Sequence, residues 1–358
     1  SDQIPEFIIK KLKKGELKNI VITGMGTCYT AAVAISMFMR ASLKKIIPEL
    51  VVEPHVASEG SAFYLKQNMN DTLVIVIAQS GTTVDTNVYV QMAKARGACS
   101  LAIANKREGD VTFIVDGTLY IGEGRDIEVA VPSTKTYTAQ VILGYLVTFY
   151  LVSKLNYTVD QEKSFLKKLK NLRDTPLLIE KSFVQINSFN EFKEITENAL
   201  KNNSWYVMSD DSSNSVCADE IRIKYSENCY QSVSTISFDE FESIDVKNSY
   251  LVHITEKKLI NLKSKIQKIL KGGNTLVIIS AGKNSLKDSK KLMKKFNSLF
   301  ILNMPYSGKY FSFIPTIIAG QLLSYFQAIN LDKRSKHFQE LLNSIDSEES
   351  FEKSIKSL

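Results

Sequence analysis

The chain has 358 residues, and its 45 lysines and arginines against 38 aspartates and glutamates give a formal net charge of +7. This length favours two domains. A composition of 44% hydrophobic and 23% charged residues excludes disordered and fibrous proteins. The lysines are spread along predicted helices, so we interpret the charge as solvated helix faces and expect no nucleic-acid partner.

The cysteine, histidine and glycine patterns predict no metal and no cofactor. The four cysteines have no metal-ligand or redox spacing, and no GxGxxG follows a predicted strand. Three histidines leave little for a zinc site. The longest apolar stretch, 141–152, is shorter than the ~20 residues that cross a bilayer, and no apolar signal segment opens the chain. We therefore expect a cytoplasmic protein with no membrane partner.

In the first half of the chain, short β-branched runs alternate with helical patterns. Strands are predicted at residues 19–23, 50–53, 72–78, 100–104, 111–115 and 118–121. Helices are predicted after the glycine turn at 24–26 and at 83–95. The run 72–78 is apolar throughout, which is typical of a parallel strand buried on both faces. This alternation predicts a doubly wound parallel α/β sheet.

A second alternation follows three helical patterns at 135–155, 161–180 and 189–201. Its strands are predicted at 205–208, 250–254, 275–280 and 299–302, and its helices at 215–227, 256–270, 288–296 and 315–329. TLVIVIAQSG in the first half and TLVIISAGKN in the second stand at equivalent places, which indicates an internal repeat. The predicted bounds are 1–157 for a phosphate-binding first domain, 158–202 for linking helices, 203–330 for a second domain and 331–358 for a C-terminal tail.

The most informative segment is QSGTTVDT at residues 79–86, which follows a predicted buried strand and opens a helix. Open α/β sheets bind ligands at the carboxyl ends of their strands, and the free N–H groups at a helix start favour an anion. Ser80, Thr82 and Thr83 offer hydroxyl donors. Gly81 lets the backbone approach a ligand closely. The segment predicts a phosphate site, with simple capping of the helix as the alternative.

A second turn, GMGTC at residues 24–28, follows the first predicted strand. If the two strands are neighbours, both turns can contact one ligand. Thr27 supplies a hydroxyl donor, whereas the Cys28 thiol is a weaker donor.

Six segments occur in the order and spacing of a known family. They are GMGTCY at 24–29, VASEG at 56–60, AQSGTTVDT at 78–86, EVAVPSTKTYTAQ at 128–140, EIRIKYSENCY at 220–230 and QLLSYFQA at 321–328. Together they resemble tandem sugar isomerase (SIS) domains, as in the isomerase half of glucosamine-6-phosphate synthase and in SIS-type glucosamine-6-phosphate deaminases. The resemblance implies two α/β domains, each a doubly wound, flavodoxin-like five-stranded parallel sheet flanked by helices. It also implies a homodimer with active sites near the subunit interface.

Carried over by position, the resemblance assigns substrate binding to a set of residues in the first half. They are Thr27, Cys28, Gln79, Ser80, Thr82, Thr83, Val131 and Ser133. In this assignment Val131 contributes its backbone, and Ser133 meets the sugar near C1 or C2.

In the second half the resemblance assigns catalysis to Glu220, Lys224 and Glu227 on one helix. Glu227 falls at the carboxylate that moves a proton between C1 and C2, and Lys224 at the lysine that stabilises the enediol oxygen. Aldose–ketose interconversion needs such a pair, because a partly dry carboxylate can act as the base and a cation stabilises the developing oxyanion. The three-residue spacing puts Lys224 and Glu227 on one helix face. An exposed ion pair is the alternative.

The sequence departs from the family pattern near its end. The family's Ser-x-Glu-Phe-x-His-Gly-Pro run is here FDEFESID at 238–245, so Ser243 replaces the ring-opening histidine and the Gly-Pro is missing. Serine is no proton donor near neutral pH as histidine is. In the tail, Lys336 is the candidate for the family's catalytic lysine and His337 for the missing histidine. A solvated tail helix is the alternative.

The leading hypothesis is a sugar-phosphate isomerase or deaminase that acts on a hexose or hexosamine 6-phosphate through a cis-enediol or enediolamine. No glutamine-hydrolysing domain precedes the first predicted strand, so a separate glutaminase subunit stays open as a partner. The rival from another class is a non-catalytic sugar-phosphate sensor or regulatory subunit that has lost turnover. A DNA-binding regulator is set aside, because about eighteen residues before the first strand are too few for a helix-turn-helix.

Overall fold

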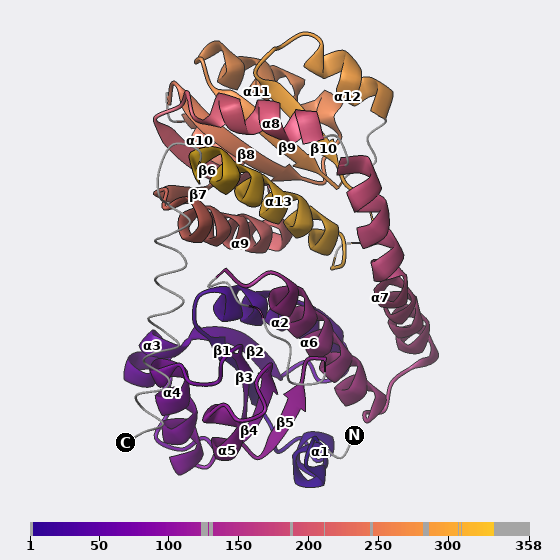
Figure 1. The fold of residues 1–358 in the computed structure, drawn as a ribbon. Coiled ribbons are helices and arrows are strands. Elements are labelled where there is room, and N and C mark those ends of the chain that lie inside the picture. Colours follow the sequence, from indigo (N-terminus) through magenta and orange to yellow (C-terminus); the bar gives the residue numbers. More distant parts are fainter. Residues whose placement is uncertain are drawn as a thin grey trace. The chain divides into compact units, whose positions relative to one another are not determined.

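The computed structural model describes residues 3–122, 128, 132–186, 189–210, 212–243, 246–281, 286–306, 308 and 310–332. Contacts divide the chain into two compact units, one of residues 1–128 and 133–173 and the other of residues 129–132 and 174–358. Each unit contains a five-stranded parallel sheet with helices packed on it (Figure 1). The predicted fold class, two tandem α/β domains with five-stranded parallel sheets, is confirmed.

The sheet of the first unit has the strand order β2-β1-β3-β4-β5, and every pairing is parallel. Its elements are α1 (Glu6–Lys13), β1 (Asn19–Gly24), α2 (Thr27–Leu43), β2 (Val51–Val56), α3 (Ala57–Glu59), η1 (Gly60–Tyr64), β3 (Thr72–Ala78), α4 (Val84–Ala95), β4 (Cys99–Ala104), α5 (Val111–Ile114), β5 (Gly117–Tyr120), α6 (Lys135–Ser153) and the first part of α7 (Val159–Ile186). β3 and β4 are buried at every position, because helices cover both faces of the sheet.

Helices α2 and α6 pack closely on one face of this sheet, while α4 and α5 cover the other (Figure 1). The close approach depends on Gly144, where a Cβ atom would lie 2.4 Å from Ile35 Cδ1. By length and composition α6 could cross a membrane, but 61% of its apolar segment is buried inside the protein. We therefore interpret α6 as a core helix.

One predicted strand is wrong. Residues 111–115 are β-branched, yet Val111–Ile114 forms the short helix α5 between β4 and β5. The buried Val111 side chain packs in the cluster that contains Tyr89 and Val90 of α4. Tertiary packing in a crossover connection overrides the intrinsic strand preference here.

The second unit repeats the topology of the first, with the order β10-β9-β8-β6-β7. Its elements are the rest of α7, α8 (Phe189–Ala199), β6 (Ser204–Ser209), α9 (Ser212–Cys229), β7 (Val233–Ser237), α10 (Phe238–Ser243), β8 (Ser249–Thr255), α11 (Leu259–Lys271), β9 (Thr275–Ser280), α12 (Leu286–Met293), β10 (Leu299–Asn303) and α13 (Phe313–Asp332). β6 corresponds to β1 and β8 to β3. The pair α9 and α13 corresponds to α2 and α6, and it too meets at a glycine, since a Cβ atom on Gly320 would lie 2.2 Å from Ile221 Cγ1.

Candidate functional site

The predicted phosphate loop lies at the switch point of the first sheet. β1 and β3 are neighbours in the sheet, while β2 lies beyond β1 and β4 beyond β3. The connections that leave β1 and β3 therefore run in opposite directions and leave a crevice at the carboxyl ends of these two strands. The turn after β1 and the loop after β3 both end there, so the sequence prediction that they face one ligand has a geometric basis.

A cavity of about 130 Å³ opens between these two loops. It is lined by Met25, Cys28, Ile77, Ala78, Gln79, Ser80, Gly81, Thr83, Thr86 and Asn87. The structure thus brings together Cys28, Gln79, Ser80 and Thr83 from the predicted substrate-binding set. Thr27 and Thr82 stand beside lining residues in the sequence without lining the cavity themselves.

The loop after β3 has a defined conformation. Gly81 has φ +77°, and a Cβ atom there would lie 2.7 Å from Gly109 Cα, so a side chain is excluded by both backbone angle and space. Val111 N donates to Gly81 O at 3.0 Å, and Asn87 Nδ2 donates to the same oxygen at 3.2 Å. These bonds fix the loop from two sides.

The loop hydroxyls do not simply cap α4. Thr83 is the N-cap residue, yet its side chain makes no capping hydrogen bond. Ser80 Oγ lies 2.9 Å from Thr82 Oγ1 and accepts a bond from Thr82 N at 3.3 Å. Thr83 lines the cavity at the helix start, where an anion is favoured.

Cys28 lies in the first turn of α2, after Gly26 with φ +53°. The sequence predicts the Cys28 thiol as a weak donor. In the structure it accepts a hydrogen bond, because Gln140 Nε2 of α6 donates to Cys28 Sγ at 3.6 Å. Thr27 is buried, and its carbonyl oxygen accepts a bond from Thr30 Oγ1 at 2.8 Å.

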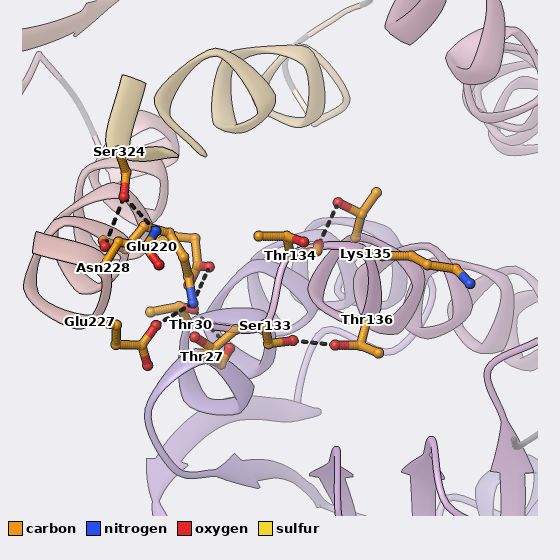
Figure 2. A network of polar contacts seen from close by, with 12 residues as sticks. Thr27, Thr30, Ser133, Thr134, Lys135, Thr136, Glu220, Glu227, Asn228 and Ser324 are labelled. Carbon is orange, nitrogen blue, oxygen red and sulfur yellow. Dashed lines mark hydrogen bonds and ion pairs between the residues drawn. The ribbon is translucent and has the colours of Figure 1, made fainter. Parts of the chain in front are cut away.

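Ser133 precedes α6 and belongs to a network that sequence reasoning missed. The Glu128 carboxylate accepts bonds from Thr134 N at 2.6 Å, Lys135 N at 2.8 Å and Thr134 Oγ1 at 2.9 Å. It also accepts a bond from Ser133 Oγ at 3.1 Å and one from Thr136 Oγ1. The Ser133 and Thr136 hydroxyl oxygens also lie within hydrogen-bond distance of each other (Figure 2). Glu128 therefore acts as the anion at the N-terminus of α6.

The electrostatics of Glu128 agree with this role. Burial acts to raise the pKa of its carboxyl group, but the hydrogen bonds from Thr136, Thr134 and Lys135 together outweigh burial and lower the pKa below its usual value. The charged form is therefore the one that the fold stabilises.

In the second unit, the three predicted catalytic residues share one face of α9. Lys224 is fully buried, and its Nζ lies 2.7 Å from Glu227 Oε2 and 3.5 Å from Glu220 Oε1. The Glu220 side chain is also fully buried, whereas that of Glu227 is 27% exposed. The alternative interpretation, an exposed ion pair, is wrong because the Lys224 side chain is fully buried. Glu227 is the one of the three that reaches solvent.

Helix α13 holds this part of α9 in place. Ser324 Oγ donates to the carbonyl oxygen of Lys224 at 2.8 Å and accepts a bond from Asn228 Nδ2 at 2.6 Å (Figure 2). The side chains of Ser324 and Asn228 thus fix the last turns of α9 against α13.

A polar cluster that sequence reasoning missed lies at the carboxyl ends of β6 and β8, the switch point of the second sheet. His253 Nε2 lies 3.1 Å from Asp210 Oδ1, and Thr255 Oγ1 donates to Asp210 Oδ2. Lys257 Nζ lies 3.4 Å from Asp210 Oδ1. Burial acts to raise the pKa of Asp210, but the bond and charge of His253, helped by Thr255 and Lys257, leave that pKa lowered. The second unit therefore has a carboxylate of its own at the place where the first has its cavity.

Several predicted residues lie outside the described part of the chain. They are Val131, Lys336 and His337.

Ser243, which replaces the family's histidine, is the last residue of α10. Within the described ranges, no three His, Cys, Asp or Glu side chains are grouped so that they could hold a metal ion.

Comparison with known proteins identifies the first unit. Residues 16–150 match the family model for the SIS domain. The glutamine–fructose-6-phosphate aminotransferase (isomerizing) of Pyrococcus horikoshii is 36% identical over 160 residues, which are 45% of this chain and 26% of the relative. The enzyme of the same name from Thermococcus kodakarensis is 36% identical over 180 residues, which are 49% of this chain and 28% of the relative. The matched part spans about a quarter of the length of these relatives.

Solved structures match over both units. The C-terminal domain of glucosamine-fructose-6-phosphate aminotransferase from Francisella tularensis has a TM-score of 0.70 at 20% identity, over 89% of this chain and 86% of that one. A glucosamine-6-phosphate deaminase from Thermotoga maritima has a TM-score of 0.61 at 16% identity, over 91% and 89%. The tagatose-6-phosphate ketose/aldose isomerase from Escherichia coli has a TM-score of 0.65 at 13% identity, over 91% and 86%. At these identities the likeness concerns the fold.

Residues 16–150 match the SIS domain, and the two five-stranded parallel sheets of the chain share the fold of structures with tandem SIS domains. More particularly, it resembles the isomerase part of glutamine–fructose-6-phosphate aminotransferase and the SIS phosphosugar isomerases and deaminases.

Proposed function

We propose that this protein is a phosphosugar isomerase or deaminase that acts on a hexose or hexosamine 6-phosphate through a cis-enediol or enediolamine. The observation that carries the proposal is the cavity at the switch point of the first sheet, lined by Cys28, Gln79, Ser80 and Thr83. A hydroxyl-rich cavity at a helix start suits a phosphate group. The names of the structural relatives agree with a phosphosugar substrate.

In this proposal the phosphate binds at the first unit. Ser80 and Thr83 donate hydroxyl hydrogen bonds to its oxygens, and the first N–H groups of α4 point toward the negative charge. Thr27, Thr82, Ser133 and the backbone at Val131 complete the substrate-binding set that the family resemblance assigns. The missing Walker pattern in this loop agrees with a phosphate monoester rather than a nucleoside triphosphate.

The carbon chemistry is assigned to α9. Glu227 moves a proton between C2 and C1, taking it from C2 of an aldose or amino sugar or from C1 of a ketose, a role that suits a carboxylate with limited exposure. Lys224 Nζ, held beside it at 2.7 Å, offers a positive charge for the oxyanion of the enediol. Glu220 is fully buried one turn before Lys224 in α9. It balances the charge of the lysine and fixes the position of its side chain.

Ring opening needs a further proton donor, because Ser243 stands where the family has its histidine. Lys336 and His337 of the tail are our candidates. The expected partners are a second copy of the chain in a homodimer and, if nitrogen is transferred, a separate glutaminase.

The test is turnover by the purified chain. We expect conversion of fructose 6-phosphate to its aldose, or release of ammonia from glucosamine 6-phosphate, each measured by chromatography of the products. Unphosphorylated fructose and glucosamine are the matched controls and should not react. Lack of turnover with both phosphosugars would contradict the proposal.

One observation favours a second candidate, a sugar-phosphate sensor without turnover. The family's ring-opening histidine is absent at Ser243, while the cavity residues Ser80 and Thr83 remain. This candidate predicts that fructose 6-phosphate raises the melting temperature of the protein although no product forms. The absence of any such shift would contradict the sensor.

A further inference from the structure

Cys28 differs from the other three cysteines of the chain in its exposure. Cys99, Cys217 and Cys229 are 4%, 0% and 3% exposed. Burial raises the pKa of the Cys99 thiol, and it raises the pKa of the Cys229 thiol to about 12. Cys28 is half-buried and lines the cavity at the switch point of the first sheet. A small reagent that enters this cavity therefore meets the Cys28 thiol, while the other three thiols lie inside the packed core.

The Cys28 side chain has a fixed position at the start of α2. Cys28 N donates to Met25 O at 3.0 Å, and a Cβ atom on Gly24 would lie 2.9 Å from Cys28 Cβ. No acidic side chain stands in the first turn of α2, so the partial positive charge of this helix end is available to an anion. Such a place favours a thiolate over a thiol, and the thiolate is the reactive form of cysteine.

A buried amide of α6 is directed at the sulfur. The Gln140 side chain is fully buried, and its Nε2 donates to Cys28 Sγ at 3.6 Å, which stabilises negative charge on the sulfur. The oxygen of the same amide, Oε1, is also buried and has no hydrogen-bond partner in the described part of the chain. A buried acceptor without a donor is costly. Gln140 Oε1 therefore favours a hydrogen-bond donor placed beside the sulfur.

Asn87 of α4 gives the cavity a second acceptor of this kind. Asn87 lines the cavity, and its Nδ2 donates to Gly81 O, while its buried Oδ1 has no hydrogen-bond partner within the described ranges. Ser80 and Thr83 line the same cavity and carry hydroxyl donors. A hydroperoxide matches this wall, because its O–H can donate to Asn87 and its leaving oxygen can accept hydrogen bonds as it becomes negative.

We propose that Cys28 is a site of reversible oxidation by small hydroperoxides and that its oxidation closes the phosphosugar site. The closing of the site rests on the proposed function, whereas the oxidation does not. In the oxidation, the thiolate sulfur attacks the O–H oxygen of the peroxide, the S–O bond forms and the O–O bond breaks. Hydroxide, or an alkoxide from an organic peroxide, leaves and takes a proton from solvent. The sulfur gives two electrons to the peroxide and becomes a sulfenic acid.

The sulfenic acid suits the surroundings of Cys28 and obstructs a phosphate. Its O–H is the donor that Gln140 Oε1 favours. Its oxygen occupies part of a cavity of about 130 Å³, and its ionised form repels a phosphate dianion. A thiol reverses the change: its sulfur attacks the sulfenic sulfur, water leaves, and a second thiol then reduces the mixed disulfide.

Mass spectrometry tests the oxidation without any phosphosugar. The chain is exposed to hydrogen peroxide for set times, catalase stops the reaction, and the remaining thiols are alkylated after unfolding. We expect Cys28 to be oxidised at least about tenfold faster than Cys99, Cys217 or Cys229. With dimedone present, the Cys28 peptide should carry the dimedone adduct of a sulfenic acid. Equal rates at all four cysteines, or no adduct at Cys28, would overturn the proposal.

Two variants test the part of Gln140. Gln140→Met keeps the size of the side chain without the amide and should slow oxidation of Cys28 at least about threefold. Gln140→Glu places a second negative charge beside the sulfur and should slow it further. Gln91→Met, at an exposed glutamine of α4, is the matched control and should react like the parent. Circular dichroism shows which variants are folded. A parent-like rate in a folded Gln140 variant would contradict the assigned hydrogen bond.

Calorimetry with fructose 6-phosphate tests the closing of the site. We expect peroxide to weaken binding at least about tenfold and dithiothreitol to restore it. Cys28→Ser cannot be oxidised at this position, so its affinity, whatever its value, should be the same before and after peroxide. Oxidation of Cys28 that leaves binding unchanged would overturn the closing of the site. Failure of the reduced parent to bind fructose 6-phosphate would refute the proposed function and with it the closing, whereas mass spectrometry alone decides the oxidation.

Discussion

Lys224 Nζ lies 2.7 Å from Glu227 Oε2, with the lysine fully buried and the glutamate 27% exposed. Glu220 Oε1 lies 3.5 Å from the same nitrogen, so two carboxylates surround one ammonium group. Of the three side chains, Glu227 is the one that is partly exposed. That asymmetry is what makes Glu227, rather than Glu220, the candidate base.

Glu227→Gln should abolish proton exchange at C1 of fructose 6-phosphate and at C2 of glucosamine 6-phosphate, and leave phosphosugar binding near the parent value. The amide keeps the size and a hydrogen bond to Lys224 but is no base. Calorimetry with fructose 6-phosphate measures binding, and NMR in heavy water measures exchange. Glu197→Gln, an exposed residue on α8, is the matched control and should behave like the parent. Persistent exchange in Glu227→Gln would remove Glu227 as the base.

Lys224→Met should destabilise the fold by about 3–5 kcal/mol, because a buried carboxylate is left without its partner. Urea unfolding followed by circular dichroism measures the loss. Lys257→Met, at a lysine 51% exposed, should change the free energy of unfolding by less than about 1 kcal/mol. Similar effects of the two substitutions would contradict the buried ion-pair arrangement.

Ser80→Ala and Thr83→Ala should each weaken binding of fructose 6-phosphate by at least about 1 kcal/mol, the value of a hydrogen bond to a charged group. Ser153→Ala removes an exposed hydroxyl at the far end of α6 and should have no effect. Calorimetry gives the dissociation constant of each variant for fructose 6-phosphate. If all three variants bind like the parent, the phosphate does not bind at this loop.

Glu128→Gln should lower stability at neutral pH by about 1–3 kcal/mol, because the charged acceptor of several hydrogen bonds is lost. The pKa of Glu128 is lowered in the folded state, so its stabilising contribution is present above the unfolded pKa and disappears as the pH falls through the folded value. The difference between parent and variant, from urea unfolding at several pH values, should therefore shrink in acid. Glu108→Gln, at an exposed glutamate, is the control. A difference that grows in acid would contradict the assigned charge state.

The sequence predicted much of the fold, because alternation of apolar strands with helices has few packed solutions. The runs TLVIVIA and TLVIIS became the interior strands β3 and β9, buried at every residue. The prediction that they stand at equivalent places is wrong, because β8 is the counterpart of β3 and β9 is the counterpart of β4. The phosphate loop was also predictable, since its residues are contiguous and follow a buried strand. Ser80 and Thr83 indeed line one cavity with Cys28 from the turn after β1.

What could not be predicted depends on contacts between distant residues or on burial. Asp210 and His253 are 43 positions apart and meet only because β6 and β8 are parallel neighbours. Glu128 lies outside any periodic pattern, and its capping of α6 across a loop has no sequence spacing of its own. The three-residue spacing of Lys224 and Glu227 fits a surface pair as well as a buried one. Only the packing of α13 on α9 distinguishes them.

Deuterium exchange distinguishes enediol chemistry from phosphosugar binding without turnover. The purified chain is incubated with fructose 6-phosphate, and separately with glucosamine 6-phosphate, in heavy water, and C1 and C2 are followed by proton NMR. We expect deuterium at C1 or C2 with the parent protein and none with Glu227→Gln. Absence of exchange from the parent with both sugars, while both raise its melting temperature, would contradict enediol chemistry and favour the sensor.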